Sequence, residues 1–396
     1  MKIGILCHAS FGGSVRVATE LAKQLANRGH QIHLFAYAPP FGQQQWRRGI
    51  TLHTLQQAVL GHAAELHVAW APAEVELLLS KVLGVIRQQG LDVLHFHYAL
   101  PFAYIAEAVH HILGDAAPRL VGTLHGTDVV THGTVAETNG RLRQAFAVMD
   151  CLTAVSHQHA QLAQKTFTLP QQPTVIPNFI RCVAEDANPR SSATGSHNRP
   201  LRLIHLSNFR AVKQTPMLAR IFAKLRQRIE AELWLIGDGP EMGATQQILR
   251  QAGVEDDVVY WGLRPNVAGL LAQGDVLLVT SQYESFSLAA LEGMSQGLVV
   301  VASRVGGLPE LVVHNRSGFL LPPTDEAAFC EAVCLLDRER GRLAEMKTAV
   351  RQRAALFSAT RAVAAYEAIY ENGRLKNPCS PLPAIQIREG MYASFN

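Results

Sequence analysis

The chain has 396 residues, which is more than one hydrophobic core usually serves, so we expect two domains. Apolar residues make up 48% of the chain and charged residues 17%, and this composition excludes an intrinsically disordered protein. The formal charge is +4 without any long block of like charges. That balance excludes a basic nucleic-acid-binding arm and suits a small anionic substrate.

The first 37 residues predict a strand, a glycine-rich turn, a helix and a second strand. The strands are expected at 2–7 and 30–37, with the helix at 14–29 between them. The first apolar run is too short for a signal peptide, and no window approaches the length of a membrane span. Six dispersed cysteines do not form a disulfide framework. We therefore expect a soluble, cytoplasmic protein.

After a looser stretch to about residue 75, strand and helix patterns alternate again. A helix is predicted at 74–90, and strands are predicted at 92–98, 119–125, 151–156 and 174–177. Such alternation is typical of parallel sheets with helices on both faces. Residues 183–200 are rich in Ser, Asn and Pro, and they are the best candidate for a linker.

The same plan starts again after this linker. A strand at 201–209, a helix at 215–229 and a strand at 231–237 repeat the opening unit. Later elements are predicted at 258–263, 275–281, 287–297, 299–303 and 359–373. The fold class is therefore α/β, with two Rossmann-like, doubly wound domains. The expected division is an N-terminal domain at 1–182, the linker, a C-terminal domain at 201–355, a helix at 356–373 returning to the N-terminal domain, and a tail at 374–396.

Two loops at strand ends are candidates for binding phosphate. Gly12, Gly13 and Ser14 open the first helix, where free amides attract anions, although an ordinary turn explains them equally well. Arg210 and Lys213 follow the first strand of the second half, at the sheet edge where ligands of such folds bind. Together they could neutralise a diphosphate without a metal; the alternative is a pair of solvated surface cations.

Glu284 and Glu292 lie around the start of the helix predicted at 287–297. The amides at that start suit a phosphate, Glu284 suits the hydroxyls of a sugar, and Glu292 suits those of a ribose. As a pair they could also be ordinary acids at a helix start. Glu255, Asp256 and Asp257 resemble a metal-binding triplet, but a solvated turn explains them better, and we expect no metal.

Two further residues close strands of the first half. His125 stands in the loop TLHGTDVV with Asp128, and Tyr98 ends HFHY. An imidazole here could contact a sugar hydroxyl or line the reaction centre. With 17 histidines in the chain, most must be incidental.

Several motifs together resemble the retaining GT-B glycosyltransferases of family four. They are the E-x₇-E stretch at 284–292, SNFRAVK at 207–213, LIGDGPE at 235–241 and VGGLPELV at 305–312. The opening GGS, HFHYALP and TLHGTDV narrow the similarity to the subfamily that begins bacillithiol biosynthesis, from Met1 to about Tyr370. The E-x₇-E pattern alone is widespread, whereas the combination of LHGTD with SNFR–K is much more specific.

This resemblance implies two domains facing across a cleft, no cofactor and transfer of a sugar with retention of configuration. The implied donor is UDP-N-acetylglucosamine and the implied acceptor is L-malate, whose proton the departing phosphate would take. The reaction centre would contain His125, Arg210, Lys213 and Glu284. The donor would be held by Gly13, Arg210, Lys213, Ser285, Phe286, Ser287, Leu288 and Glu292. The acceptor would be held by Ser14, Tyr98, Thr123 and Asn208.

The sequence departs from the family pattern at a few positions. Val15 and Arg16 replace a glycine and an aliphatic residue, Ser287 replaces a glycine, and Val299 replaces a proline. Another family-four activity, on a sugar phosphate or a lipid-linked glycan, therefore stays open; Trp46, adjacent to two arginines, is a weak hint of a lipid. Two other functions also stay open, a nucleotide-sugar epimerase and a non-catalytic nucleotide-sugar sensor. A homodimer stays open as the oligomeric state.

Overall fold

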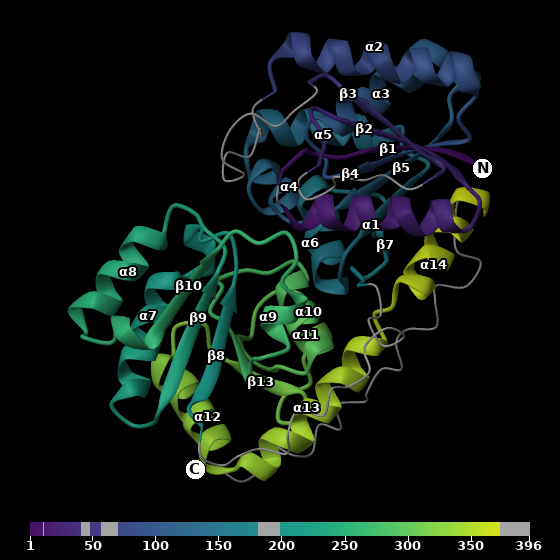
Figure 1. The fold of residues 1–396 in the computed structure, drawn as a ribbon. Helices are drawn as coiled ribbons and strands as arrows, with labels where there is room; N and C mark the ends of the chain where they lie inside the picture. The colour runs from purple at the N-terminus through teal and green to yellow at the C-terminus, as the bar shows by residue number, and fades with distance from the viewer. Residues whose placement is uncertain (11, 41–47, 57–69, 181–198, 373–396) are drawn as a thin grey trace.

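The computed structural model describes residues 1–10, 12–40, 48–56, 70–180 and 199–372. Within them the chain forms two α/β units, seen as the upper and lower halves of Figure 1, each built on a parallel sheet. The stretch around Trp46, most of the predicted linker and the predicted tail lie outside the described residues.

The N-terminal sheet has the strand order β3-β2-β1-β4-β5-β6-β7. Its strands are β1 (Lys2–Leu6), β2 (Gln31–Ala36), β3 (Ile50–Thr54), β4 (Val93–His97), β5 (Arg119–Leu124), β6 (Cys151–Ala154) and β7 (Thr174–Val175). The helices are α1 (Gly13–Asn27), α2 (Pro72–Gln89), α3 (Phe102–Leu113), α4 (Thr127–Val130), α5 (Ala136–Ala147) and α6 (His157–Phe167). The strand order reverses between β1 and β4, which creates a crevice at their carboxyl ends.

The C-terminal sheet has the order β10-β9-β8-β11-β12-β13. Its strands are β8 (Leu201–Leu206), β9 (Ala231–Ile236), β10 (Val258–Gly262), β11 (Val276–Val279), β12 (Val299–Ser303) and β13 (Gly318–Leu321). Its helices are α7 (Thr215–Arg226), α8 (Met242–Gln251), α9 (Ala268–Leu271), α10 (Leu288–Gln296), α11 (Leu308–Leu311), α12 (Glu326–Arg338) and α13 (Arg340–Ala355). Here the order reverses between β8 and β11.

Buried apolar side chains lie on both faces of each sheet. Successive strand residues point to opposite faces, so Leu203 joins the cluster under α7 and α12 while its neighbour Ile204 joins the cluster under α10 and α13. Both residues are fully buried. This two-sided burial explains why apolar residues occupy most positions on both faces of the predicted strands.

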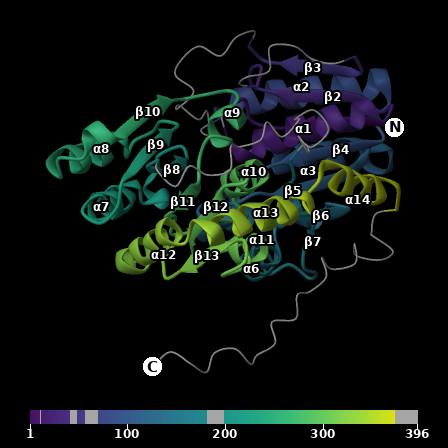
Figure 2. The ribbon, with the colours of Figure 1, turned by 60° about the horizontal axis from the view of Figure 1, so that its bottom comes forward.

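The last helix, α14 (Ala359–Asn372), packs on the N-terminal unit. Figures 1 and 2 both show it following α13, and it contacts α1 near the N-terminus of the chain in Figure 1. Tyr366 and Tyr370 share a core cluster with Ile3, and the Arg119 guanidinium donates to the carbonyl of Ile369 at 3.1 Å. The chain therefore crosses between the two units a second time.

The structure adds elements that the sequence patterns did not predict. β3 lies in the stretch before residue 75, for which no element was predicted. Its residues are only partly buried at the edge of the sheet, so they lack the apolar pattern of a buried strand. β13 was not predicted either, and the predicted strand at 174–177 is reduced to the two residues of β7. The predicted turn VGGLPE leads into the short helix α11.

Candidate active site

The candidate residues cluster where both sheets reverse their strand order. The segments that follow β1, β4 and β5 bring Ser14, Tyr98 and His125 from the N-terminal unit. Loops after β8 and β11 bring residues 207–214 and 280–287 from the C-terminal unit. Side chains from the two units contact one another here, so the crevices join in one cleft.

Lys213 and Glu284 form an ion pair in this cleft. The Lys213 Nζ lies 2.7 Å from Glu284 Oε1, and the Ser281 hydroxyl donates to the same oxygen at 2.8 Å. Only 19% of the lysine side chain and 10% of the glutamate side chain are exposed. A Cβ at Gly306 would lie 1.8 Å from the Glu284 carbonyl oxygen, so the VGG turn holds this loop by a contact that only glycine allows.

Arg210 and Asn208 offer polar atoms without protein partners. The Arg210 Nε and the Asn208 Oδ1 are buried, and neither has a hydrogen-bond partner among the described residues. Phe209 between them adopts a left-handed φ of 42° and is fully buried, which fixes the loop. A buried donor and a buried acceptor without partners are costly, and they favour a site that a polar ligand completes.

The segment that leads into α10 contacts the N-terminal unit directly. The Ser285 hydroxyl donates to the carbonyl of His125, and the Ser156 hydroxyl donates to the carbonyl of Ser285 at 2.6 Å. Phe286 is 1% exposed and anchors this start in the core. A Cβ at Gly13 would lie 3.3 Å from a methyl of Leu288, so the first turns of α1 and α10 nearly touch.

Ser287 has a left-handed φ of 80° and caps α10, its hydroxyl accepting from the amide of Ala290. That backbone explains why the family pattern has glycine here, because a side chain is strained in this region.

Glu292 pairs with Arg16 across the cleft. The Arg16 Nη1 lies 2.7 Å from Oε1 and 3.0 Å from Oε2 of the carboxylate. Burial raises the pKa of Glu292, and the arginine opposes that increase. Arg16 therefore points into the cleft and neutralises a buried acid.

His125 is held through both its backbone and its ring. The Asp128 carboxylate accepts from its amide at 3.0 Å, and His97 Nδ1 lies 3.0 Å from its Nε2. Burial lowers its pKa well below the ordinary value, and His97 and His159 lower it further. The ring is therefore neutral near pH 7 and can exchange a hydrogen bond without carrying charge. His97 was not selected as a candidate from the sequence, although His95 and His97 alternate along β4 and therefore point to the same face of the sheet.

The predicted acceptor residues differ in whether they reach the cleft. Ser14 is half-buried in the first turn of α1, and Tyr98, with a φ of 82°, forms a 2.8 Å hydrogen bond between its hydroxyl and Thr127. Thr123 is fully buried, with its hydroxyl 2.7 Å from both His95 Nε2 and the Thr153 hydroxyl. The structure therefore brings Ser14 and Tyr98 to the cleft and leaves Thr123 engaged beneath it.

Two more contacts across the cleft were not foreseen. The Tyr283 hydroxyl lies 2.8 Å from His159 Nδ1. The Glu310 carboxylate accepts from the first amides of α6, those of His157 and Gln158, at 2.9 Å each. A carboxylate at a helix start is favourable, and here it joins two units that are distant in sequence. The sequence contains little sign of these two contacts, because each joins residues that come close only when the two units face each other.

The acidic triplet at 255–257 is a short turn before β10. Glu255 pairs with Arg250 at 3.0 Å, and Asp257 pairs with Arg226 at 2.8 Å. Among the described residues, no group of three or more His, Cys, Asp or Glu side chains is placed to hold a metal ion. In the same part of the chain, no helix is long and apolar enough to cross a membrane.

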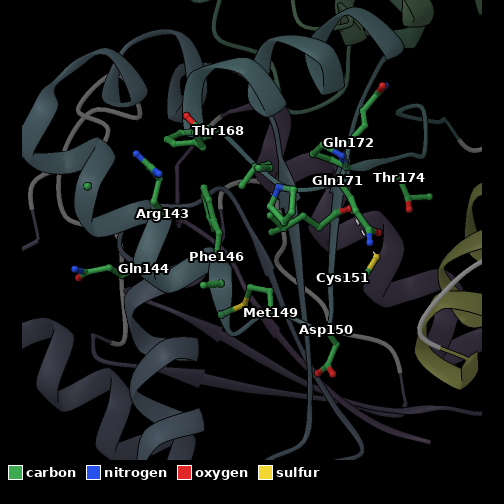
Figure 3. A pocket seen from close by; sticks show the side chains of 17 residues that line it. Arg143, Gln144, Phe146, Met149, Asp150, Cys151, Thr168, Gln171, Gln172 and Thr174 are labelled. Carbon is green, nitrogen blue, oxygen red and sulfur yellow. Dashed lines mark hydrogen bonds between the residues drawn. The ribbon is translucent and has the colours of Figure 1, made fainter.

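A cavity of about 970 Å³ lies elsewhere, between α5, the start of β6 and the segment after α6 (Figure 3). Cys151 begins β6, so this cavity is at the amino ends of the strands, opposite the cleft. The charged side chains labelled there are Arg143 and Asp150, and Asp150 already accepts from the amide of Leu120. A smaller crevice of about 250 Å³ in the cleft is lined by Arg16 and Glu292.

Comparisons with known sequences agree with this arrangement. The family described as Glycosyltransferase Family 4 matches residues 11–183, and the one described as Glycosyl transferases group 1 matches residues 200–338. A similar curated protein is N-acetyl-alpha-D-glucosaminyl L-malate synthase of Bacillus anthracis, with 33% identity over 93% of this chain and 96% of the relative. The GPI3 subunit of the yeast phosphatidylinositol N-acetylglucosaminyltransferase is 24% identical over 80% of this chain and 71% of its own.

Solved structures show the same fold. The sucrose-phosphate synthase of Thermosynechococcus elongatus has a TM-score of 0.77 at 19% identity, covering 94% of this chain and 98% of its own. Anabaena HepE in complex with UDP has a TM-score of 0.73 at 20% identity, covering 94% and 100%. The predicted fold, two Rossmann-like domains in the GT-B arrangement, is thereby confirmed. The chain belongs to glycosyltransferase family 4 and is a nucleotide-sugar-dependent glycosyltransferase.

Proposed function

We propose that this enzyme transfers N-acetylglucosamine from UDP-N-acetylglucosamine to L-malate with retention of configuration. The observation that carries the proposal is the convergence of Arg210, Lys213 and Glu284 from one unit with His125 from the other. The Ser285–His125 contact ties these loops together. The 33% identity to a malate-glycosylating relative, over nearly the full length of both chains, supports the choice of acceptor.

In this proposal, the diphosphate takes the place next to Arg210 and Lys213. The buried Arg210 Nε, which has no partner among the described residues, gains a phosphate oxygen, and the lysine adds a countercharge. Glu292 accepts from the ribose hydroxyls, while Glu284 and the loop from Ser285 to Leu288 hold the sugar. Solved relatives bound to UDP and to UDP-glucose support a uridine donor.

Malate lies on the other side of the sugar, against Ser14, Tyr98 and Asn208. Thr123 stays a prediction, with a hydroxyl that already has partners. The bond between the anomeric carbon and the β-phosphate oxygen breaks, and the bond to the malate hydroxyl oxygen forms on the same face. The malate proton passes to the departing phosphate. Neutral His125 lines the reaction centre and offers a hydrogen bond. Catalysis then consists of positioning the two substrates and stabilising the negative charge of the leaving diphosphate.

The test is a mass-spectrometric assay of purified enzyme with UDP-N-acetylglucosamine and malate, compared with related hydroxy acids. We expect UDP and a glycosylated malate, whose anomeric coupling in proton NMR identifies the α-linkage. UDP-glucose in place of the donor tests the sugar, since Ser287 replaces the family's glycine beside it. Turnover only with a sugar phosphate or glycan acceptor would refute the malate assignment, and interconversion of the donor without any acceptor would indicate an epimerase.

The predicted homodimer and the predicted cytoplasmic location are separate proposals. Light scattering on the purified protein tests the first, and cell fractionation tests the second. Buried free thiols at Cys7, Cys330 and Cys334 are compatible with a reducing compartment.

A further inference from the structure

Arg16 forms an ion pair with Glu292, the carboxylate that the proposed function assigns to binding the ribose. It lies in the first turn of α1, whereas Glu292 lies on α10 of the other unit. One guanidinium nitrogen, Nη1, is within 3.0 Å of both carboxylate oxygens. Within the described residues, the acid has no other side-chain hydrogen-bond partner. The pair therefore bridges the cleft at one point.

The two partners differ in burial. Glu292 is 9% exposed as a residue, whereas 43% of the Arg16 side chain is open to solvent. Burial raises the pKa of Glu292 and so disfavours its charged form, and the arginine opposes that increase. A buried carboxylate needs a partner, but a half-exposed guanidinium is solvated when it swings away. Separation of the pair therefore costs free energy at Glu292 but not at Arg16, and another hydrogen-bond donor to Glu292 would remove that cost.

The ribose of a nucleotide is such a donor. Its two neighbouring hydroxyls can each donate to one carboxylate oxygen, and those are the oxygens that Nη1 now contacts. Both arrangements need the same edge of the carboxylate, so they exclude each other. The 250 Å³ crevice lined by Arg16, Glu292 and Asn266 gives the guanidinium room to withdraw.

We propose that Arg16 competes with the donor ribose for Glu292 and thereby sets the enzyme's affinity for its nucleotide. The proposal rests on the proposed function, because it takes Glu292 as the ribose ligand. In the empty enzyme Arg16 pairs with Glu292 and links the two units. On binding, the hydroxyls take over the carboxylate and the link opens. Arg16 is thus a positioning residue that acts through Glu292.

The expected effect is modest. Exposed or half-exposed ion pairs contribute little, so removing the competitor should tighten UDP binding about two- to fivefold. A nucleotide that lacks one ribose hydroxyl competes less fully for the carboxylate, so it should benefit less. The loss of affinity on removing the 2′-hydroxyl should therefore be larger in the variant than in the natural enzyme.

The experiment is isothermal titration of UDP and 2′-deoxy-UDP into the full chain and into Arg16→Val. Arg28→Ala is the matched control, because Arg28 caps the C-terminal end of the same helix and pairs with Glu367 of α14, away from the cleft. We expect tighter UDP binding in Arg16→Val, little gain for 2′-deoxy-UDP, and unchanged binding in Arg28→Ala. Thermal unfolding checks each fold, and Arg16→Gln replaces the valine variant if that one does not fold.

Unchanged or weaker UDP binding in Arg16→Val overturns the proposal, as does an equal gain for both nucleotides or a gain in Arg28→Ala. Glu292→Gln separates this failure from that of the proposed function. If Glu292→Gln binds UDP as well as the natural enzyme, the ribose assignment itself fails. If Glu292→Gln weakens binding but Arg16→Val does not improve it, the assignment stands and only the competition is refuted.

Discussion

Replacing Lys213 with methionine should separate the catalytic role of this residue from its structural role. Methionine keeps an unbranched apolar side chain but removes the charge that faces Glu284 at 2.7 Å. Transfer should fall because the leaving diphosphate loses a countercharge. Stability should also fall because a carboxylate with 10% exposure loses its cation.

The two effects have different magnitudes. At about 4 Å and an effective dielectric constant of about 20, one ion contact is worth about 4 kcal/mol, which corresponds to a loss of about 10³ in kcat/KM. For the fold, Glu284 keeps the Ser281 hydroxyl as a donor, so we expect a cost of about 2 kcal/mol. In a domain of this size that lowers Tm by about 4–8 °C.

The double variant Lys213→Met with Glu284→Gln distinguishes the two roles. A neutral glutamine still accepts from Ser281 and leaves no unpaired charge, so Tm should recover while activity stays low. The assays are thermal unfolding and initial-rate measurements with UDP-N-acetylglucosamine. Full activity in Lys213→Met would refute the clamp on the diphosphate. A Tm that falls further in the double variant would refute the charge-pair explanation of stability.

Four shorter predictions concern the surrounding structure. Gly306→Ala forces a Cβ to 1.8 Å from the Glu284 carbonyl and should lower Tm and activity together, whereas Gly243→Ala, with open space around it in α8, should leave both nearly unchanged. Ser287→Gly relieves a φ of 80° and should raise stability by about 1 kcal/mol in denaturant unfolding; a loss would show that the helix cap matters more than the strain. Burial lowers the pKa of His205 to about 4, so below pH 6.5 only the unfolded chain takes up its proton. Stability should therefore fall by about 2 kcal/mol per such histidine between pH 6.5 and 5, and His205→Gln should show a shallower slope. EDTA should leave turnover unchanged, and a loss that magnesium restores would contradict metal-independent transfer.

Local sequence patterns predicted most of the strands and the helices α1, α2, α7, α10 and α14, whereas α3, α5, α6, α8, α12 and α13 were not predicted. Continuous apolar runs such as VLLV of β11 identify strands buried on both faces, because such burial leaves no polar alternation. The edge strand β3 was missed for the opposite reason, since its residues are only partly buried. The acidic triplet was interpreted as a solvated turn, and the structure adds that Arg250 and Arg226 pair with two of its acids.

Residue types after strand ends made Lys213, Glu284 and His125 candidates, because parallel strands place their carboxyl ends at one edge. The family's glycine at position 287 acquires a physical reason only from the backbone, which is left-handed there.

What the sequence determined by itself was therefore periodic and local: the alternating elements, the repeated unit and the charged loops that close its strands. The tertiary structure decided the pairing of side chains that are far apart along the chain. Arg16 with Glu292, His97 with His125 and Tyr283 with His159 are each set by how two sheet edges or neighbouring strands meet. Such contacts depend on distances of a few ångströms between separate elements, and no spacing within one segment encodes them.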